Sequence, residues 1–129
     1  MAKSEDRVLK PTNQIFRRDQ DVSWNEIKLI EGKPANPGLK IKVLMITENI
    51  RVAKAHRVKG LIDLPHQHDD HESVAVLLSG KLTMKIGDKE FIANPGDVWH
   101  HKPGVLHSSD ALEESVQIEI KFPPRKTWD

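Results

Sequence analysis

The segment Gly60-Leu61-Ile62-Asp63-Leu64-Pro65-His66-Gln67-His68-Asp69-Asp70-His71-Glu72 carries two histidines one residue apart, followed by an acid. A further histidine, His107, follows the turn signal Pro95-Gly96-Asp97, and six of the seven histidines lie between His66 and His107. Neutral imidazoles and a carboxylate are ligands that divalent first-row transition metals accept. The pattern therefore predicts a metal site in the middle of the chain.

Short apolar runs separated by turn residues surround this segment and predict an all-β domain. The strand signal is carried by residues 40–46, 49–59, 74–78, 81–86, 90–93 and 116–122. Gly87-Asp88-Lys89 is typical of a hairpin turn, and the only helix candidate is the short stretch from Asp110 to Glu114. Many short strands with frequent turns favour a closed barrel or a two-sheet sandwich with little helix.

The histidine spacing suits a strand. Residues i and i+2 of a strand project from the same face, so the imidazoles of His66 and His68 can reach one ion. Glu72 opens the next strand and His107 comes from another hairpin. Three nitrogens and one oxygen leave coordination positions open, as in catalytic sites. Imidazole with carboxylate suits Fe, Mn, Ni, Zn, Co or Cu, so the ligand set predicts one divalent transition metal ion without naming it.

Both halves of the pattern resemble the two motifs of the cupin family. The first motif, with its His-X-His pair, acid and closing glycine, matches the stretch from Gly60 to Gly80. The second matches Pro95-Gly96-Asp97 and then Pro103-Gly104-Val105-Leu106-His107. The resemblance implies a cupin-type jelly-roll β-barrel in which His66, His68, Glu72 and His107 hold the metal. Counting backwards from Gly80 instead puts Ser73 in the place of Glu72, and His71 is a further alternative.

The C-terminal end is similar to that of small single-domain cupins of pectin and alginate breakdown. The similarity lies in residues 107–116 and in Phe122-Pro123-Pro124-Arg125-Lys126-Thr127-Trp128. Those cupins assist the opening of 4,5-unsaturated uronates, which implies a small sugar acid as the substrate and isomerisation or ring opening by Lewis-acid catalysis. Iron at the same ligands would instead favour a dioxygenase, and a non-catalytic module that binds or senses a small ligand is a third hypothesis.

Two histidines are candidate proton carriers for such a reaction. His56 qualifies if its strand face points inward, although solvent exposure of that face is the alternative interpretation. His100 and His101 are adjacent in a predicted strand, so only one of them can face the interior, and we assign that place to His101. We therefore expect His56 and His101 to move protons beside the metal.

Composition limits the other classes of function. The chain has 129 residues, a formal net charge of +1 and no cysteine, which excludes a thiolate metal site and gives no basic footprint for nucleic acid. No apolar run is long enough to span a bilayer and the start lacks a signal peptide, so we expect a cytoplasmic protein.

Domain organisation is also simple. We expect an N-terminal arm or edge segment over residues 1–21 and a single barrel over residues 22–129. The arm is either a disordered tail or a strand that pairs with a second subunit. Cupin barrels often pair, so we expect a homodimer in which the arm and the strand 40–46 supply the edge.

Overall fold

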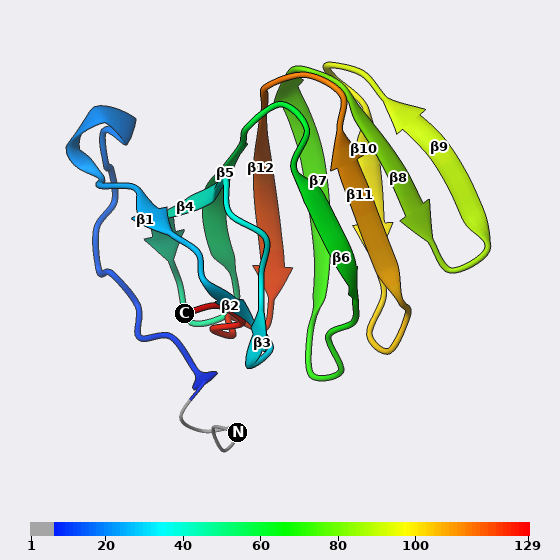
Figure 1. Cartoon of the computed structure of the whole chain (residues 1–129). Coiled ribbons are helices and arrows are strands. Elements are labelled where there is room, and N and C mark those ends of the chain that lie inside the picture. The colour runs from blue at the N-terminus through cyan, green and yellow to red at the C-terminus, as the bar shows by residue number, and fades with distance from the viewer. Residues whose placement is uncertain (1–6) are drawn as a thin grey trace.

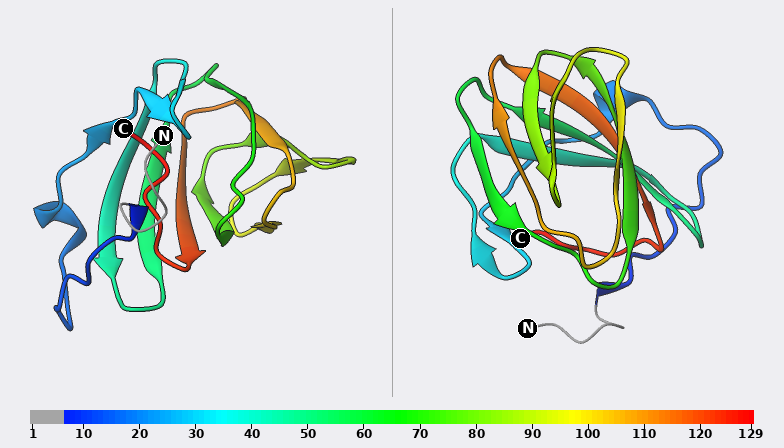
Figure 2. Two further views of the ribbon diagram at one scale, coloured as in Figure 1. Left: turned by 90° about the horizontal axis from the view of Figure 1, so that it is seen from below. Right: turned by 90° about the vertical axis from the view of Figure 1, so that its right-hand side faces the viewer.

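The computed structural model describes residues 7–129 and has two facing antiparallel sheets (Figure 1). The six-stranded sheet has the order β1-β4-β5-β12-β7-β10, and the four-stranded sheet has the order β6-β11-β8-β9. A small β2-β3 hairpin lies beside them, and two further views show the sheets curving around a common interior (Figure 2). This all-β architecture confirms the predicted jelly-roll barrel.

The strands are β1 (Asn25–Glu26), β2 (Leu29–Ile30), β3 (Lys33–Pro34), β4 (Leu39–Ile46), β5 (Arg51–Arg57), β6 (Ile62–His66), β7 (Glu72–Ser79), β8 (Leu82–Ile86), β9 (Lys89–Ala93), β10 (Val98–His101), β11 (His107–Ala111) and β12 (Ser115–Phe122). The helix candidate from Asp110 to Glu114 is wrong, because Asp110 and Ala111 complete β11 and pair with Thr83 and Leu82 of β8. Cross-strand pairing overrides the local preference here. Among residues 7–129 no helix has the length and apolar character needed to cross a membrane.

Strand alternation divides the barrel interior into an apolar part and a polar part. The apolar part is a cluster of buried side chains that includes Leu61, Ala75, Leu77, Leu82, Ala93, Trp99 and Ala111. The polar part is lined by the inward residues of β5 and β12: Arg51, Arg57, Gln117, Glu119 and Lys121. The small residues Ala53 and Ala55 separate the two arginines and leave space between the sheets.

The N-terminal segment covers the outer side of β4. Thr12 donates its backbone N–H to the carbonyl of Ile46 at 3.0 Å, and β1 pairs with the start of β4. The Lys42 ammonium lies 3.0 Å from a carboxylate oxygen of Asp19 and 4.7 Å from the centre of the Trp24 ring. The edge at residues 40–46, which we expected to supply a dimer contact together with the arm, is therefore partly covered by the same chain.

The boundary between the predicted arm, residues 1–21, and the barrel, residues 22–129, stays a prediction. Residues 1–6 of that arm lie outside the described residues. The part of the arm that is described packs onto the barrel, as the contact between Thr12 and β4 shows.

Gly80 offers a direct test of the packing between β7 and β12. Its φ is +93°, and a Cβ there would lie 2.6 Å from the Ser115 Cα and closer still to Ser115 Oγ and the Glu114 carbonyl. Gly96 has the same φ of +93° with nothing within 4 Å, so it is a matched control. We expect Gly96→Ala to lower the free energy of unfolding by about 1–2 kcal/mol through backbone strain alone.

We expect Gly80→Ala to lose about 1–3 kcal/mol more than Gly96→Ala, because the added methyl also overpacks the site. Urea denaturation of both variants measures the difference. Equal losses would mean that the contact between Gly80 and Ser115 does not constrain the barrel.

Candidate metal centre

Three predicted ligands come together inside the barrel. His66 ends β6 and His107 begins β11, and the two residues lie directly opposite each other in the antiparallel pair. Their Nε2 atoms are 3.0 Å apart. His68 follows β6, and one ring nitrogen from each of the three histidines lies within 4.8 Å of the others.

The two sequence motifs meet at a backbone contact. The N–H of Gly104, in the turn before His107, donates to the carbonyl of His68 at 2.8 Å. The Gly104 φ of +75° is in the left-handed region, which glycine adopts without strain. This contact places His68 beside His107 although 39 residues separate them in the chain.

Hydrogen bonds fix the position of the proton on two of the rings. His66 Nδ1 lies 2.7 Å from the carbonyl of Leu64, and His68 Nδ1 lies 3.3 Å from a carboxylate oxygen of Glu31. Both partners are acceptors, so each Nδ1 carries the proton and each Nε2 keeps its lone pair. Burial lowers the pKa of His68 well below its usual range and that of His107 to about 2. The rings of His68 and His107 are therefore neutral at neutral pH, which suits a divalent transition metal.

The structure does not bring Glu72 to the three histidines. Odd-numbered residues of β7 face the interior, so Glu72 points outward, where its carboxylate lies 3.2 Å from exposed His100. In this structure Glu72 is therefore not placed to be the fourth ligand. Its alternatives, Ser73 and His71, are buried but are not part of the three-histidine group found among the described residues.

The structure also places His56 away from the three histidines. Odd-numbered residues of β5 line the pocket, so His56 lies on the outer face, where its ring centre is 6.0 Å from that of Trp24. Its Nε2 is 3.7 Å from a carboxylate oxygen of Glu114. The solvent-side interpretation of this strand face is the better one, because β5 pairs in the middle of the sheet with its arginines inward.

His101 lies in the pocket, where we placed it as a proton carrier. Its ring centre is 3.9 Å from that of His107, and Trp99 Nε1 donates a hydrogen bond to its Nε2 at 3.1 Å. The proton of the neutral ring is therefore on Nδ1, which is buried without a partner among the described residues. Burial lowers the pKa of His101 to about 4, so this ring is neutral at pH 7.

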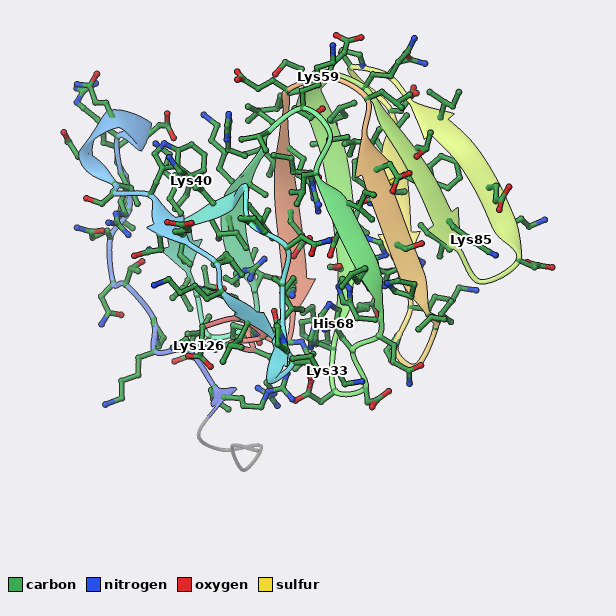
Figure 3. All side chains as sticks on the ribbon, viewed as in Figure 1. Lys33, Lys40, Lys59, His68, Lys85 and Lys126 are labelled. Carbon is green, nitrogen blue, oxygen red and sulfur yellow. The ribbon has the colours of Figure 1, made fainter. Side chains whose placement is uncertain are left out.

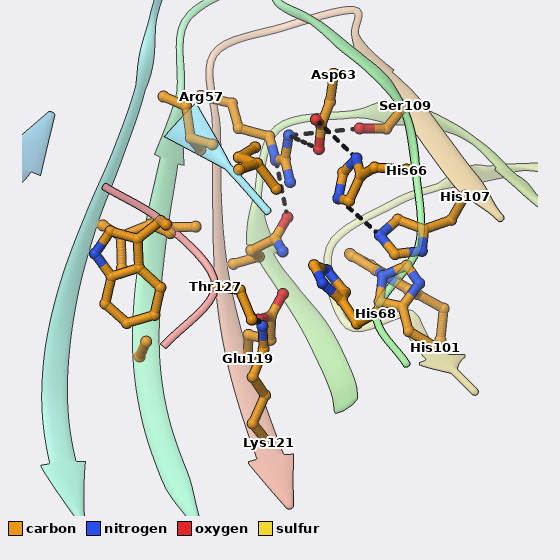
Figure 4. Close-up of a pocket in the computed structure, with 18 of the residues that line it drawn as sticks. Arg57, Asp63, His66, His68, His101, His107, Ser109, Glu119, Lys121 and Thr127 are labelled. Atoms are coloured by element: carbon orange, nitrogen blue, oxygen red, sulfur yellow. Dashed lines mark hydrogen bonds and ion pairs between the residues drawn. The ribbon is translucent and has the colours of Figure 1, made fainter. Parts of the chain in front are cut away.

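Opposite the histidines, the inward polar side chains of β5 and β12 form a wall of the pocket that sequence analysis missed. Arg57 donates to Gln117 at 3.1 Å, to Asp63 at 3.2 Å and to Ser109 at 3.4 Å (Figure 4). In Figure 3, His68 lies at the lower end of the barrel, close to the hairpin that carries Lys33. Apolar and polar residues alternate over residues 116–122, which indicates a strand. Alternation alone does not tell which face of that strand points into the barrel.

Further along the same wall, a buried carboxylate is held between two cations. Glu119 lies 2.8 Å from Arg51 and 3.4 Å from Lys121. Burial by itself raises the pKa of Glu119, but Lys121 and Arg51 outweigh it and hold that pKa well below its usual range. Burial lowers the pKa of Lys121 to about 8, so Lys121 is still mostly charged at pH 7. The pocket thus contains a permanent carboxylate facing the histidines (Figure 4).

Comparisons with known proteins identify relatives of the chain. Residues 56–118 match the cupin domain family model. The pectin degradation protein KdgF of Dickeya dadantii (strain 3937) is 25% identical over 108 residues, covering 84% of this chain and 91% of that protein.

Two solved structures share the fold. KdgF from Halomonas sp. superposes with a TM-score of 0.75 at 21% identity, covering 88% of this chain and 96% of that one. An RmlC-like cupin from Shewanella frigidimarina gives a TM-score of 0.76 at 18% identity, covering 89% and 95%. The family match, the barrel and the paired histidine motifs together show that the chain is a small cupin.

Proposed function

We propose that this cupin is a metal-dependent enzyme that isomerises or opens the ring of a small sugar acid. The observation that carries the proposal is the convergence of His66, His68 and His107, with one ring nitrogen of each within 4.8 Å of the others, on one wall of a pocket. The other wall carries the buried carboxylate of Glu119. A metal ligand set facing a fixed base is an arrangement for proton transfer on a bound hydroxyl or carbonyl compound.

The charges of the pocket favour an acidic ligand. Three cations line it, Arg51, Arg57 and Lys121, against two carboxylates, Asp63 and Glu119. A bound divalent ion would add to this excess of positive charge. A carboxylate of the substrate would balance it, and neighbouring Ser109 and Gln117 offer partners for sugar hydroxyls. The similarity to a pectin degradation protein points to the same class of compound.

Each pocket residue has a role in the proposed reaction. His66, His68 and His107 would hold a divalent ion, which acts as a Lewis acid that makes a bound hydroxyl more acidic. Glu119, ionised at neutral pH, accepts the proton of the anomeric hydroxyl. As that proton leaves, the bond from the anomeric carbon to the ring oxygen breaks. The carbon of the ring double bond then takes up a proton, which the protonated Glu119 returns, so the product is an isomer and no co-reactant is needed. Neutral His101 can orient the substrate by donating a hydrogen bond from Nδ1.

The proposal is tested by incubating the protein with a 4,5-unsaturated uronate and Mn²⁺, Fe²⁺, Ni²⁺ or Zn²⁺. We expect the ultraviolet absorbance of the unsaturated sugar to fall faster than without protein, with no oxygen uptake. Oxygen consumption that requires Fe²⁺ would favour the dioxygenase instead. Binding of the uronate by calorimetry with no change in rate would favour a binding module.

Replacing a histidine ligand by alanine is expected to remove the metal and leave the barrel folded. The variants are His66→Ala and His107→Ala, and His100→Ala on the outer face is the matched control because its side chain is 43% exposed beside Glu72. Elemental analysis after metal loading should give about one ion per chain in the wild type and the control, and almost none in the two variants. Full metal occupancy in His107→Ala, with unchanged circular dichroism, would refute the ligand assignment.

Replacing Glu119 by glutamine is expected to separate catalysis from metal binding. Glu119→Gln keeps the size of the side chain but removes the base, so kcat should fall about 10²–10⁴-fold while the bound metal stays. Elemental analysis and the ultraviolet assay on one preparation check both outcomes. Activity within a few-fold of the wild type would remove Glu119 from the mechanism.

We still predict a homodimer, but through the outer face of the six-stranded sheet and not through the arm and the strand edge at residues 40–46. The outer face of the six-stranded sheet exposes five large apolar side chains on three adjacent strands: Val74 and Leu78 of β7, Val98 of β10, and Ile120 and Phe122 of β12. Exposed apolar patches of this kind mark interaction sites, and a two-fold axis would bury the patch of each copy against the other. A cytoplasmic location also stays a prediction from composition.

Light scattering coupled to size exclusion should give twice the chain mass of 14.7 kDa at micromolar concentration. Ile120→Lys should shift the mass to that of one chain, because the added charge cannot be buried in an apolar interface. A wild-type mass of one chain would end the dimer prediction.

A further inference from the structure

Three segments that are far apart in the sequence meet next to His68. They are the N-terminal segment at Arg7, the turn at Glu31, and the C-terminal tail at residues 124–128. Lys126 donates its N–H to the carbonyl of Arg7 at 2.7 Å, and Arg7 Nε donates back to the carbonyl of Lys126 at 3.2 Å. Glu31 donates its N–H to the carbonyl of Thr127 at 2.7 Å. The tail therefore fixes both Arg7 and Glu31 in place.

Glu31 occupies a backbone position that a glutamate seldom adopts. It and Gly32 form the two-residue turn of the β2-β3 hairpin, with φ values of +51° and +76°. Turns with two positive φ values favour Asn-Gly, and a glutamate in the left-handed region costs about 1–2 kcal/mol. One oxygen of its carboxylate, Oε1, makes two contacts: it forms an ion pair with Arg7 and accepts the Nδ1–H of His68 at 3.3 Å. A strained residue with an engaged side chain points to a functional constraint.

Arg7 joins this carboxylate to a second one. Its guanidinium pairs with Glu31 and lies 3.7 Å from Asp70, which in turn accepts the Nδ1–H of His71 at 2.9 Å. Each of the two carboxylates thus orients one histidine, and a single arginine side chain, 16% exposed, lies between them. Without Arg7, two partly buried carboxylates would face each other with less compensation, and Glu31 could turn towards water.

We propose that Arg7 and Glu31 are positioning residues for His68, so that the N-terminal segment of the chain sets the affinity of the metal centre. Glu31 holds the proton on His68 Nδ1 and directs Nε2 towards His66 and His107, whose ring centres are 5.1 and 5.2 Å from that of His68. Arg7 fixes the Glu31 carboxylate. The proposal rests on the proposed metal site, but the orientation of His68 can be measured without metal.

The metal affinity of Glu31→Gln is the first test. Glutamine keeps the length of the side chain and the same backbone preference, so the variant removes only the charge. We expect the dissociation constant for Zn²⁺, measured by competition with a chelator, to rise about 10–100-fold. Arg7→Met should weaken binding in the same direction, and Arg7→Lys should restore most of the affinity. The matched control is Glu90→Gln, whose carboxylate forms an exposed pair with Lys85 at 3.9 Å.

The metal-free protein supplies the second test. Nitrogen NMR shifts of the His68 ring should show a proton on Nδ1 in the wild type and in Glu90→Gln, and a mixture of tautomers in Glu31→Gln and Arg7→Met. Thermal unfolding of each variant confirms that the barrel is intact.

Unchanged Zn²⁺ affinity together with an unchanged His68 tautomer in Glu31→Gln would overturn the positioning role. A wild type that binds no metal, while the variants still change the tautomer, would overturn the metal proposal and support the positioning of His68.

Discussion

The pairing of β6 with β11 is the constraint on which the site depends, because it sets His66 directly opposite His107. Directly opposed residues on antiparallel strands hold their Cβ atoms about 4.5–5.5 Å apart, close enough for two imidazoles to share one ion. β11 also pairs with β8, where His107 lies opposite Ile86, so its register is held from both sides. A slip of one residue would turn an imidazole out of the barrel, since successive side chains point to opposite faces.

The polar half of the interior stabilises the fold less than an apolar interior would. Moving an ion from water into a protein interior costs several kcal/mol even when a partner is present. Arg51 and Lys121 are buried there, and the Glu119 side chain between them is 20% exposed. Hydrophobic residues of similar volume would stabilise the barrel at least as well. The apolar cluster around Leu77 and Leu82 carries the stability instead. We therefore expect the charged cluster to serve ligand binding and proton transfer, and not the stability of the barrel.

The C-terminal tail also contributes to the pocket, beside the barrel strands. The tail carries Thr127, which accepts a hydrogen bond from Lys121 at 3.1 Å, and Trp128, whose ring centre lies 5.1 Å from the Arg51 guanidinium. The same tail holds Arg7 and Glu31 beside His68. The centre is thus built by two strand pairs, one hairpin and both ends of the described chain, and no local stretch contains more than part of it.

The amino-acid sequence by itself determined the all-β class, most strand ranges and the pair His66 and His68 with His107, because residue type and spacing record which side chains share a face. It did not determine which face is inside. A period of two looks the same in both orientations, so alternation could not decide whether His56 points inward, and it did not reveal that Gln117, Glu119 and Lys121 face the pocket. Motif spacing likewise left the choice between Glu72 and Ser73 open. Only the packing of the two sheets chose the orientation, and only contacts over 30 residues or more, such as Glu31 with His68, decided which side chains surround the histidines.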